Sequence, residues 1–114
     1  MVYLMNKMTK QLRKNICLNL LRISNRKINE IRVGNNESKD HRAIKTLICN
    51  KLLSEGKDFV TEAIFKSGGR ADILILEEFK AIEILKTEKE SNILNKKLKY
   101  PRGIVFEIVK IAKK

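Results

Sequence analysis

The chain has 114 residues, the length of one domain, so its function must reside on a single core or arise from an oligomer. An apolar fraction of 43% excludes a disordered chain, and an aromatic fraction of 5% argues against a platform that stacks single-stranded bases. Twenty-five Lys and Arg face 13 Asp and Glu, and the net charge of +12 favours a polyanionic partner, nucleic acid first. A lysine-rich, solvated surface is the alternative explanation of this charge.

Residues 1–35 form a basic extension that holds eight Lys and Arg and one acid, Glu30. Its apolar residues recur at the spacing of one helical face, which predicts an amphipathic helix over residues 6–23. The apolar stripe consists of Leu12, Ile16, Leu20 and Ile23. Three interpretations stay open: the helix packs on the core, pairs with its copy in a dimer, or lies along a phosphate backbone. The cations available for that backbone include Lys10, Arg13 and Lys14.

Residues 36–114 have the pattern of an α/β core, which together with the extension makes one structural domain. Ser38 fits a helix N-cap, and Gly56 fits a helix stop. The expected elements are a helix over 38–55, strands over 59–66, 71–76 and 81–86, a helix over 88–99 and a strand over 104–111. Residues 28–33 fit either a short strand or a helix end. The nearly continuous apolar character of the three middle strands predicts a sheet covered on both faces.

The sequence also bears on the compartment. Cys17 and Cys49 fall on helical apolar patterns, and with a single histidine they cannot complete a zinc site. That histidine, His41, is expected to be structural. Basic residues interrupt the N-terminal apolar positions, and no apolar run approaches the roughly 20 residues that span a bilayer. We therefore expect a cytoplasmic protein with no membrane partner.

Two acids, Asp72 and Glu83, stand inside otherwise apolar strands. An unpaired carboxylate is costly there, so a cation, a hydrogen-bond network or a metal ion must compensate. If the strands form a hairpin with Leu76 opposite Ala81, both acids project to the same face, one diagonal step apart. That is within reach of one divalent ion. A salt bridge between Asp72 and Arg70 at a strand end is the alternative.

Such a pair has a chemistry. A Mg²⁺ or Mn²⁺ ion held by both carboxylates and by a carbonyl such as that of Ile84 would polarise a phosphodiester and activate a water molecule. The positive field would attract the substrate, and a nearby lysine would stabilise the developing charge.

The order of elements and the placement of Asp72 and Glu83 resemble the PD-(D/E)xK nuclease superfamily, which has a restriction-endonuclease-like core. The resemblance covers about residues 37–111. It implies a mixed four-stranded sheet in the order αβββαβ, here with an extra N-terminal helix. It also implies that Asp72 and Glu83 are metal-binding and catalytic. Glu62, on the first strand, matches a third acidic position that some members use, although a solvated strand acid is the alternative.

The chain departs from the superfamily at the motif lysine, where it has Leu85. Lys86 comes one residue late and by parity faces the other side, unless a β-bulge re-aims it. Lys96 or Lys97 from the second helix, or Lys66, are the other candidates for the basic group. If none of them reaches the acids, the site is inactive.

The sequence thus predicts a metal-dependent nuclease that acts on DNA, works as a homodimer, and uses Lys86 or Lys97 beside the two acids. The expected nucleic-acid contacts are Lys10, Arg13, Lys14, Arg70 and Lys96. Two alternatives stay open: a catalytically inactive nucleic-acid-binding protein on the same fold, and a basic adaptor that binds an acidic protein.

Overall fold

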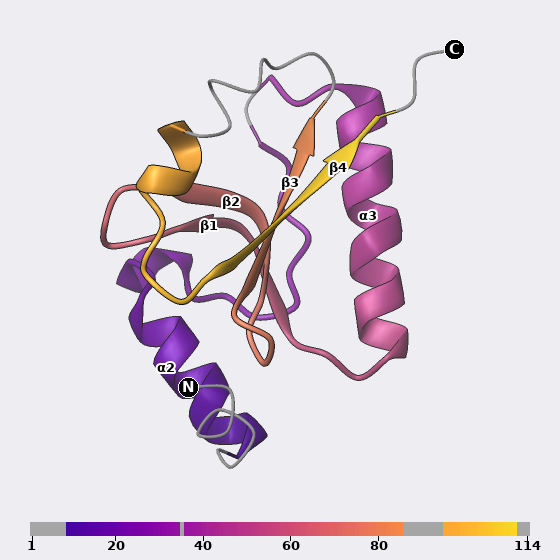
Figure 1. Ribbon diagram of the computed structural model, residues 1–114. Helices are drawn as coiled ribbons and strands as arrows, with labels where there is room; N and C mark the ends of the chain where they lie inside the picture. Colours follow the sequence, from indigo (N-terminus) through magenta and orange to yellow (C-terminus); the bar gives the residue numbers. More distant parts are fainter. Residues whose placement is uncertain (1–8, 35, 86–94, 112–114) are drawn as a thin grey trace.

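The computed structural model describes residues 9–34, 36–85 and 95–111 (Figure 1). It is an α/β structure built on one four-stranded sheet with strands in the order β1-β2-β3-β4. The strands are β1 (Phe59–Ile64), β2 (Arg70–Ile75), β3 (Lys80–Leu85) and β4 (Val105–Lys110). The first three strands are antiparallel neighbours, and β4 runs parallel to β3, so the sheet is mixed as expected.

Helix α3 (Lys39–Ser54) covers one face of the sheet. The Ser38 hydroxyl accepts a hydrogen bond from the backbone N–H of His41, and Gly56 follows the helix with a φ of 71°, so both predicted ends are confirmed. The helix packs Cys49 and Leu52 against alternate residues of the strands. Of the second predicted helix, residues 95–98 are helical, and residues 86–94 lie outside the described part of the chain.

Helix α2 (Lys10–Asn19) lies on the opposite face, because Leu74 packs with it whereas Ile73 packs under α3 (Figure 1). From α2 and the turn that follows it, Cys17 and Leu21 are buried against this face. Packing on the core, one of the three interpretations of this helix, is therefore what the structure shows.

Most of the apolar stripe is not the face by which α2 packs on the core, and the helix spans Lys10–Asn19 and not the predicted residues 6–23. Leu12, Ile16 and Ile23 are 46%, 39% and 81% exposed. The helix is rotated so that Arg13 donates a 3.1 Å hydrogen bond to the carbonyl of Glu77 and Lys14 forms an ion pair with Asp58. These polar anchors, together with Cys17 and Leu21, select a different face from the one that hydrophobic spacing alone indicates.

Residues 28–33 belong to neither a helix nor a strand and run along the outer edge of β1. The backbone N–H of Asn29 donates to the carbonyl of Phe59 at 2.8 Å. Thr61 Oγ1 donates to the Glu30 carbonyl at 2.6 Å and accepts from the Arg32 N–H at 2.9 Å. The segment thereby satisfies an edge that would otherwise be open for pairing.

The β2–β3 hairpin has a register two residues away from the predicted one. Leu74, not Leu76, lies opposite Ala81, because the turn occupies residues 76–79 and Phe79 adopts a φ of 48°. A shift of two residues preserves strand parity, but alternation is interrupted at Asp72, because Ala71 and Leu74 pack in the same cluster. What the structure shows is that Asp72 and Glu83 line one cavity. The correction moves the two acids from a diagonal to directly opposite positions.

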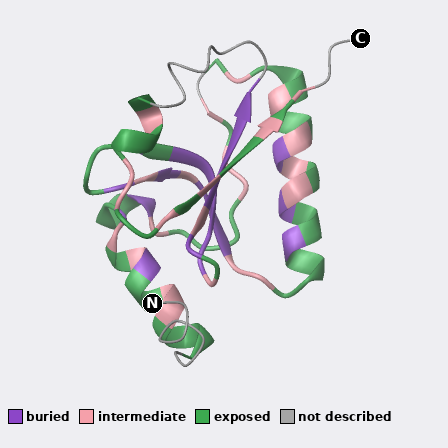
Figure 2. Ribbon diagram, viewed as in Figure 1, coloured by how far each residue is buried: buried purple, intermediate pink, exposed green. Residues whose placement is uncertain are grey.

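The sheet opens next to these acids. Recorded pairing between β2 and β3 ends at Ile73 and Ile82, whereas β3 and β4 pair along all six of their residues. Both β2 and β3 are buried apart from their first residues, as Figure 2 shows. Within the described residues, no helix is long and apolar enough to cross a membrane.

Candidate functional site

Asp72 and Glu83 lie together where β2 and β3 separate, and they are only 8% and 3% exposed. Asp72 Oδ2 accepts a 2.8 Å hydrogen bond from the backbone N–H of Ile84. A cavity of about 350 Å³ opens over the two acids. Its other lining residues are His41, Gly68, Gly69, Arg70, Ile84, Lys96 and Lys99. The predicted acid pair is thus brought together at the base of a partly basic cavity.

The backbone of Ile84 faces the acids. The carbonyl of Leu85 accepts from Ile111, so the backbone groups of Leu85 point toward the β4 side. Because backbone groups alternate in direction along a strand, those of Ile84 point toward β2. The predicted carbonyl ligand therefore lies on the cavity side of β3.

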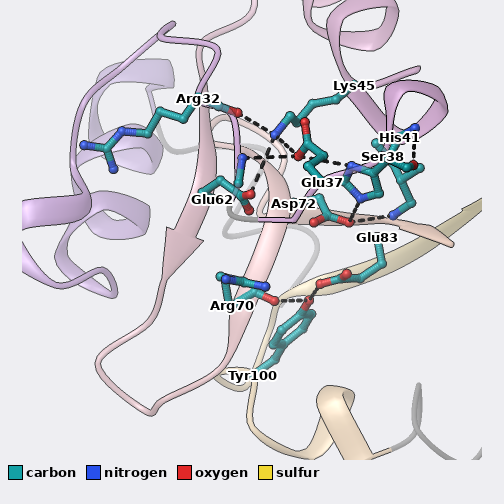
Figure 3. Close-up of polar contacts among 12 residues, drawn as sticks. Arg32, Glu37, Ser38, His41, Lys45, Glu62, Arg70, Asp72, Glu83 and Tyr100 are labelled. Carbon is teal, nitrogen blue, oxygen red and sulfur yellow. Dashed lines mark hydrogen bonds and ion pairs between the residues drawn. The ribbon is translucent and has the colours of Figure 1, made fainter. Parts of the chain in front are cut away.

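Tyr100 is the direct partner of Glu83 (Figure 3). Its hydroxyl is hydrogen-bonded to Glu83 Oε1 and lies 3.1 Å from the carbonyl of Arg70. The ring is tilted against Phe65 and Phe106, with centroids 5.2 and 5.4 Å away. Nothing in the sequence identified this residue, because its partners come from three distant parts of the chain.

The electrostatics of the pair favour a bound cation. Burial first, and then the negative charge of Asp72, raise the pKa of Glu83 to about 8, while Tyr100 and Lys96 act in the opposite direction. Burial and the charge of Glu83 also raise the pKa of Tyr100 above its ordinary value. A carboxyl group whose pKa is strongly raised beside a second acid in a cavity is typical of a functional site. A divalent ion would relieve this repulsion.

His41 bridges two acids rather than serving only as a helix residue. Its Nε2 lies 3.3 Å from Asp72 Oδ2, and its Nδ1 lies 3.2 Å from Glu37 Oε2. His41 and Lys45, four residues apart, lie on one face of α3. Glu37, just before the N-cap Ser38, contacts both of them. That polar stripe is the sequence signal that could have identified Glu37 and Lys45.

Lys45 is fully buried beneath the site. Its Nζ donates to Glu37 Oε2 and to the carbonyl of Arg32, both at 2.5 Å, and lies 3.7 Å from Glu62 Oε1 (Figure 3). Burial raises the pKa of Glu37, but the hydrogen bond and charge of Lys45 outweigh it and leave the pKa below its ordinary value. Lys45 therefore neutralises buried acids and is not a group that substrate can reach.

Glu62 belongs to this lysine cluster. Its backbone has a φ of 49°, rare for a residue other than glycine, and this interrupts the recorded β1–β2 pairing opposite Asp72. A Cβ atom on Gly34 would lie 2.1 Å from Glu62 Oε1, so a larger residue there would require the Glu62 side chain to move. With Asp72, Glu62 lines a neighbouring cavity of about 260 Å³. It sits beside the acid pair with Lys45 as its cationic partner.

The predicted cations fall in two places. Arg70 and Lys96 line the cavity above the acids, whereas Lys97 is exposed and is not among its described lining residues. Lys86 lies outside the described residues. Arg13 and Lys14 anchor α2 near Asp58 and the β2–β3 turn, at the end of the sheet away from the acids, and Lys10 is exposed on the same helix.

The side chains alone do not complete a metal site: no cluster of three or more His, Cys, Asp and Glu side chains suited to a metal ion occurs in residues 9–34, 36–85 and 95–111. A cation here would take the carboxylates of Asp72 and Glu83, the Ile84 carbonyl and water. That set fits Mg²⁺ or Mn²⁺, since Mg²⁺ commonly keeps several waters and binds one or two carboxylates. It does not fit zinc, which prefers His and Cys.

Comparison with known proteins gives no relative: no family model, curated protein or solved structure matches the chain.

Proposed function

We propose that this protein is a metal-dependent nuclease with a restriction-endonuclease-like core of the PD-(D/E)xK type, and that it cleaves phosphodiester bonds in DNA. The observation that carries the proposal is that Asp72 on β2 and Glu83 on β3 are both buried at the base of one cavity with basic walls. The mixed sheet, with three antiparallel strands followed by a parallel one, agrees with that core.

The residues have separate roles in this proposal. Asp72, Glu83 and the Ile84 carbonyl hold Mg²⁺ or Mn²⁺, which when bound polarises the phosphodiester and promotes ionisation of a water molecule. The Ile84 amide fixes the Asp72 carboxylate by its hydrogen bond. His41 holds the same carboxylate from the side of α3. Glu62 pairs with the buried Lys45 and adds negative charge next to the proposed metal site.

Lys96 is the best replacement for the absent motif lysine. It lines the cavity, and its charge lowers the pKa of Glu83, so it acts on the acid pair across a short distance. Arg70 and Lys99 line the same cavity and would bind the phosphates on either side of the scissile bond. Lys97, one residue along, is exposed away from this lining.

A non-catalytic nucleic-acid-binding protein on the same fold is the second candidate. Leu85, at the position of the motif lysine, is 4% exposed and belongs to the buried sheet. A site that has lost its lysine but kept a basic cavity would bind DNA without cutting it.

Cleavage assays separate these two candidates. Supercoiled plasmid and branched DNA are incubated with Mg²⁺ or Mn²⁺ and with wild type, Asp72→Asn, Glu83→Gln or Glu107→Gln. The last variant makes the same chemical change as Glu83→Gln at an exposed residue of β4. We expect cutting by wild type and Glu107→Gln only. Metal-independent binding without cutting by wild type would favour the non-catalytic candidate.

Homodimerisation is part of the same proposal. Leu12 and Ile16 are 46% and 39% exposed on α2, so this face of the helix suits pairing with a second copy. Sedimentation velocity of wild type and Leu12→Lys measures it. A monomer at all concentrations would exclude this part of the proposal and leave the cleavage site unaffected.

A further inference from the structure

Tyr100 joins three parts of the chain that surround the acid pair. Its hydroxyl is hydrogen-bonded to Glu83 on β3 and lies 3.1 Å from the carbonyl of Arg70 on β2. Its backbone directly follows the helical residues 95–98 and Lys99, the segment that brings Lys96 to the cavity. Tyr100 thus contacts the acid and the neighbouring strand through its side chain, and its backbone continues the segment that carries the basic wall.

The position of the Tyr100 ring is determined by its surroundings. The ring is packed between Phe65 and Phe106, at tilts of 58° and 56°. The β1–β2 turn approaches closely as well, since a Cβ atom on Gly69 would lie 2.9 Å from the ring and 2.9 Å from the Lys99 carbonyl. Ser67 Oγ donates to that same carbonyl at 2.6 Å. The hydroxyl is therefore presented to Glu83 by a rigid aromatic cluster.

The consequence concerns Glu83. A glutamate side chain has several rotatable bonds, and fixing it when a cation binds costs conformational entropy. Hydrogen bonds to the side chains that coordinate a metal orient those side chains before the metal binds. Because Tyr100 holds one carboxylate oxygen of Glu83, the other oxygen is left for a ligand shared with Asp72.

We propose that Tyr100 is a positioning residue that fixes the Glu83 carboxylate for the divalent cation. This inference rests on the proposed function, because it assumes that Asp72 and Glu83 bind the ion. Tyr100 acts through Glu83 and does not touch the metal. Its contribution lies in its hydroxyl, whereas the ring serves packing.

Tyr100→Phe isolates the hydroxyl, because it retains the ring between Phe65 and Phe106. Mn²⁺ affinity is measured by isothermal titration calorimetry for wild type, Tyr100→Phe, Asp72→Asn and the control Ser54→Ala. Ser54 donates its hydroxyl to the Lys51 carbonyl at the far end of α3, so its variant also removes one hydroxyl that binds a carbonyl. We expect Tyr100→Phe to bind Mn²⁺ about tenfold more weakly, since a hydrogen bond to a charged group is worth that much or more.

A second measurement separates positioning from general stability. Metal-free DNA affinity and Tm are recorded for the same proteins. Tyr100→Phe should leave metal-free DNA affinity unchanged, because Arg70, Lys96 and Lys99 are intact. Gly69→Ala should weaken both Mn²⁺ and DNA binding, because the added Cβ meets the Lys99 backbone and displaces the basic segment together with Tyr100.

The outcomes are distinct. Weaker Mn²⁺ binding by Tyr100→Phe with unchanged DNA affinity supports the inference. Equal Mn²⁺ affinity in wild type and Tyr100→Phe overturns it while the proposed function stands. A parallel loss of Mn²⁺ binding, DNA binding and Tm in Tyr100→Phe assigns Tyr100 a merely structural role and overturns it as well. No Mn²⁺ binding by wild type overturns the proposed function, and the inference with it.

Discussion

The Asp72 carboxylate accepts a 2.8 Å hydrogen bond from the backbone amide of Ile84, so a side chain on β2 satisfies the backbone of β3 where the two strands have separated. Pairing between β2 and β3 stops at Ile73 and Ile82, the residues next to Asp72 and Glu83. The buried Asp72 therefore replaces a backbone partner for Ile84 at the point where β2 and β3 separate. The opening in turn gives space for the cavity above Asp72 and Glu83.

Asp72→Asn should keep the fold and abolish cleavage. The amide oxygen of asparagine can still accept from the Ile84 amide, so the open end of the sheet stays satisfied. The substitution also removes the negative charge that raises the pKa of Glu83. We therefore expect the free energy of unfolding at pH 8 to rise, because Glu83 can ionise there without a second negative charge beside it. Urea unfolding measures it. A large loss of stability would contradict this account of Asp72.

The stability of the protein should fall with rising pH because of Glu83. Its pKa is raised from 4.5 to about 8 in the native state. Between these two values the unfolded chain releases the proton that the native protein retains, so the free energy of unfolding decreases as pH rises. Urea unfolding at a series of pH values should show this decline, and Glu83→Gln should flatten it. An identical pH dependence in the variant would show that Glu83 ionises normally.

Lys45→Met should be strongly destabilising. Removing the ammonium leaves Glu37 buried and without its cationic partner, and breaking a buried ion pair in this way costs about 3–5 kcal/mol. Lys51→Met, at an exposed position of the same helix, is the matched control and should change stability by less than about 1 kcal/mol. Adding Glu37→Leu to Lys45→Met should recover part of the loss. Equal effects of the two single lysine substitutions would rule out this role for Lys45.

Lys96→Ala should lower the cleavage rate by about a hundredfold, because removal of one group that stabilises transition-state charge has an effect of this size. Lys97→Ala is the adjacent control and should change the rate less than about twofold. Both variants remove one positive charge, so a non-specific electrostatic effect would lower both rates equally. Single-turnover cleavage with saturating Mg²⁺ distinguishes the two. A similar loss in both variants would remove Lys96 from the catalytic site.

Much of the core could be predicted from local pattern. Ser38 and Gly56 bounded a helix whose ends the structure confirms, and the apolar runs placed all four strands to within two residues. Asp72 and Glu83 stood out because a carboxylate in an apolar strand needs a partner. Their meeting at one cavity survived the error in register, although the face that each acid takes depends on an interruption of the strand near Asp72 that the pattern does not contain.

Other features depended on contacts that local pattern does not contain. The face by which α2 packs on the core could not be chosen from spacing, because Arg13 and Lys14 bind Glu77 and Asp58, residues distant in sequence. Tyr100 reaches Glu83 only through the packing of Phe65 and Phe106 around its ring. The regular spacing of Glu37, His41 and Lys45 was visible in the sequence. It indicates a role only once Asp72 and Glu62, which contact His41 and Lys45, are known to lie beside them.

Sensitised Tb³⁺ luminescence tests the central claim, that Asp72 and Glu83 share one cation, most directly. The chain has no Trp and two Tyr, and Tyr100 is hydrogen-bonded to Glu83, so excitation of tyrosine should reach an ion held at this pair. We predict Tb³⁺ emission that Mn²⁺ displaces in wild type and in the control Tyr3→Phe, and no such emission in Asp72→Asn, Glu83→Gln or Tyr100→Phe. Emission that persists in both acid variants, or its absence in wild type, would contradict the claim.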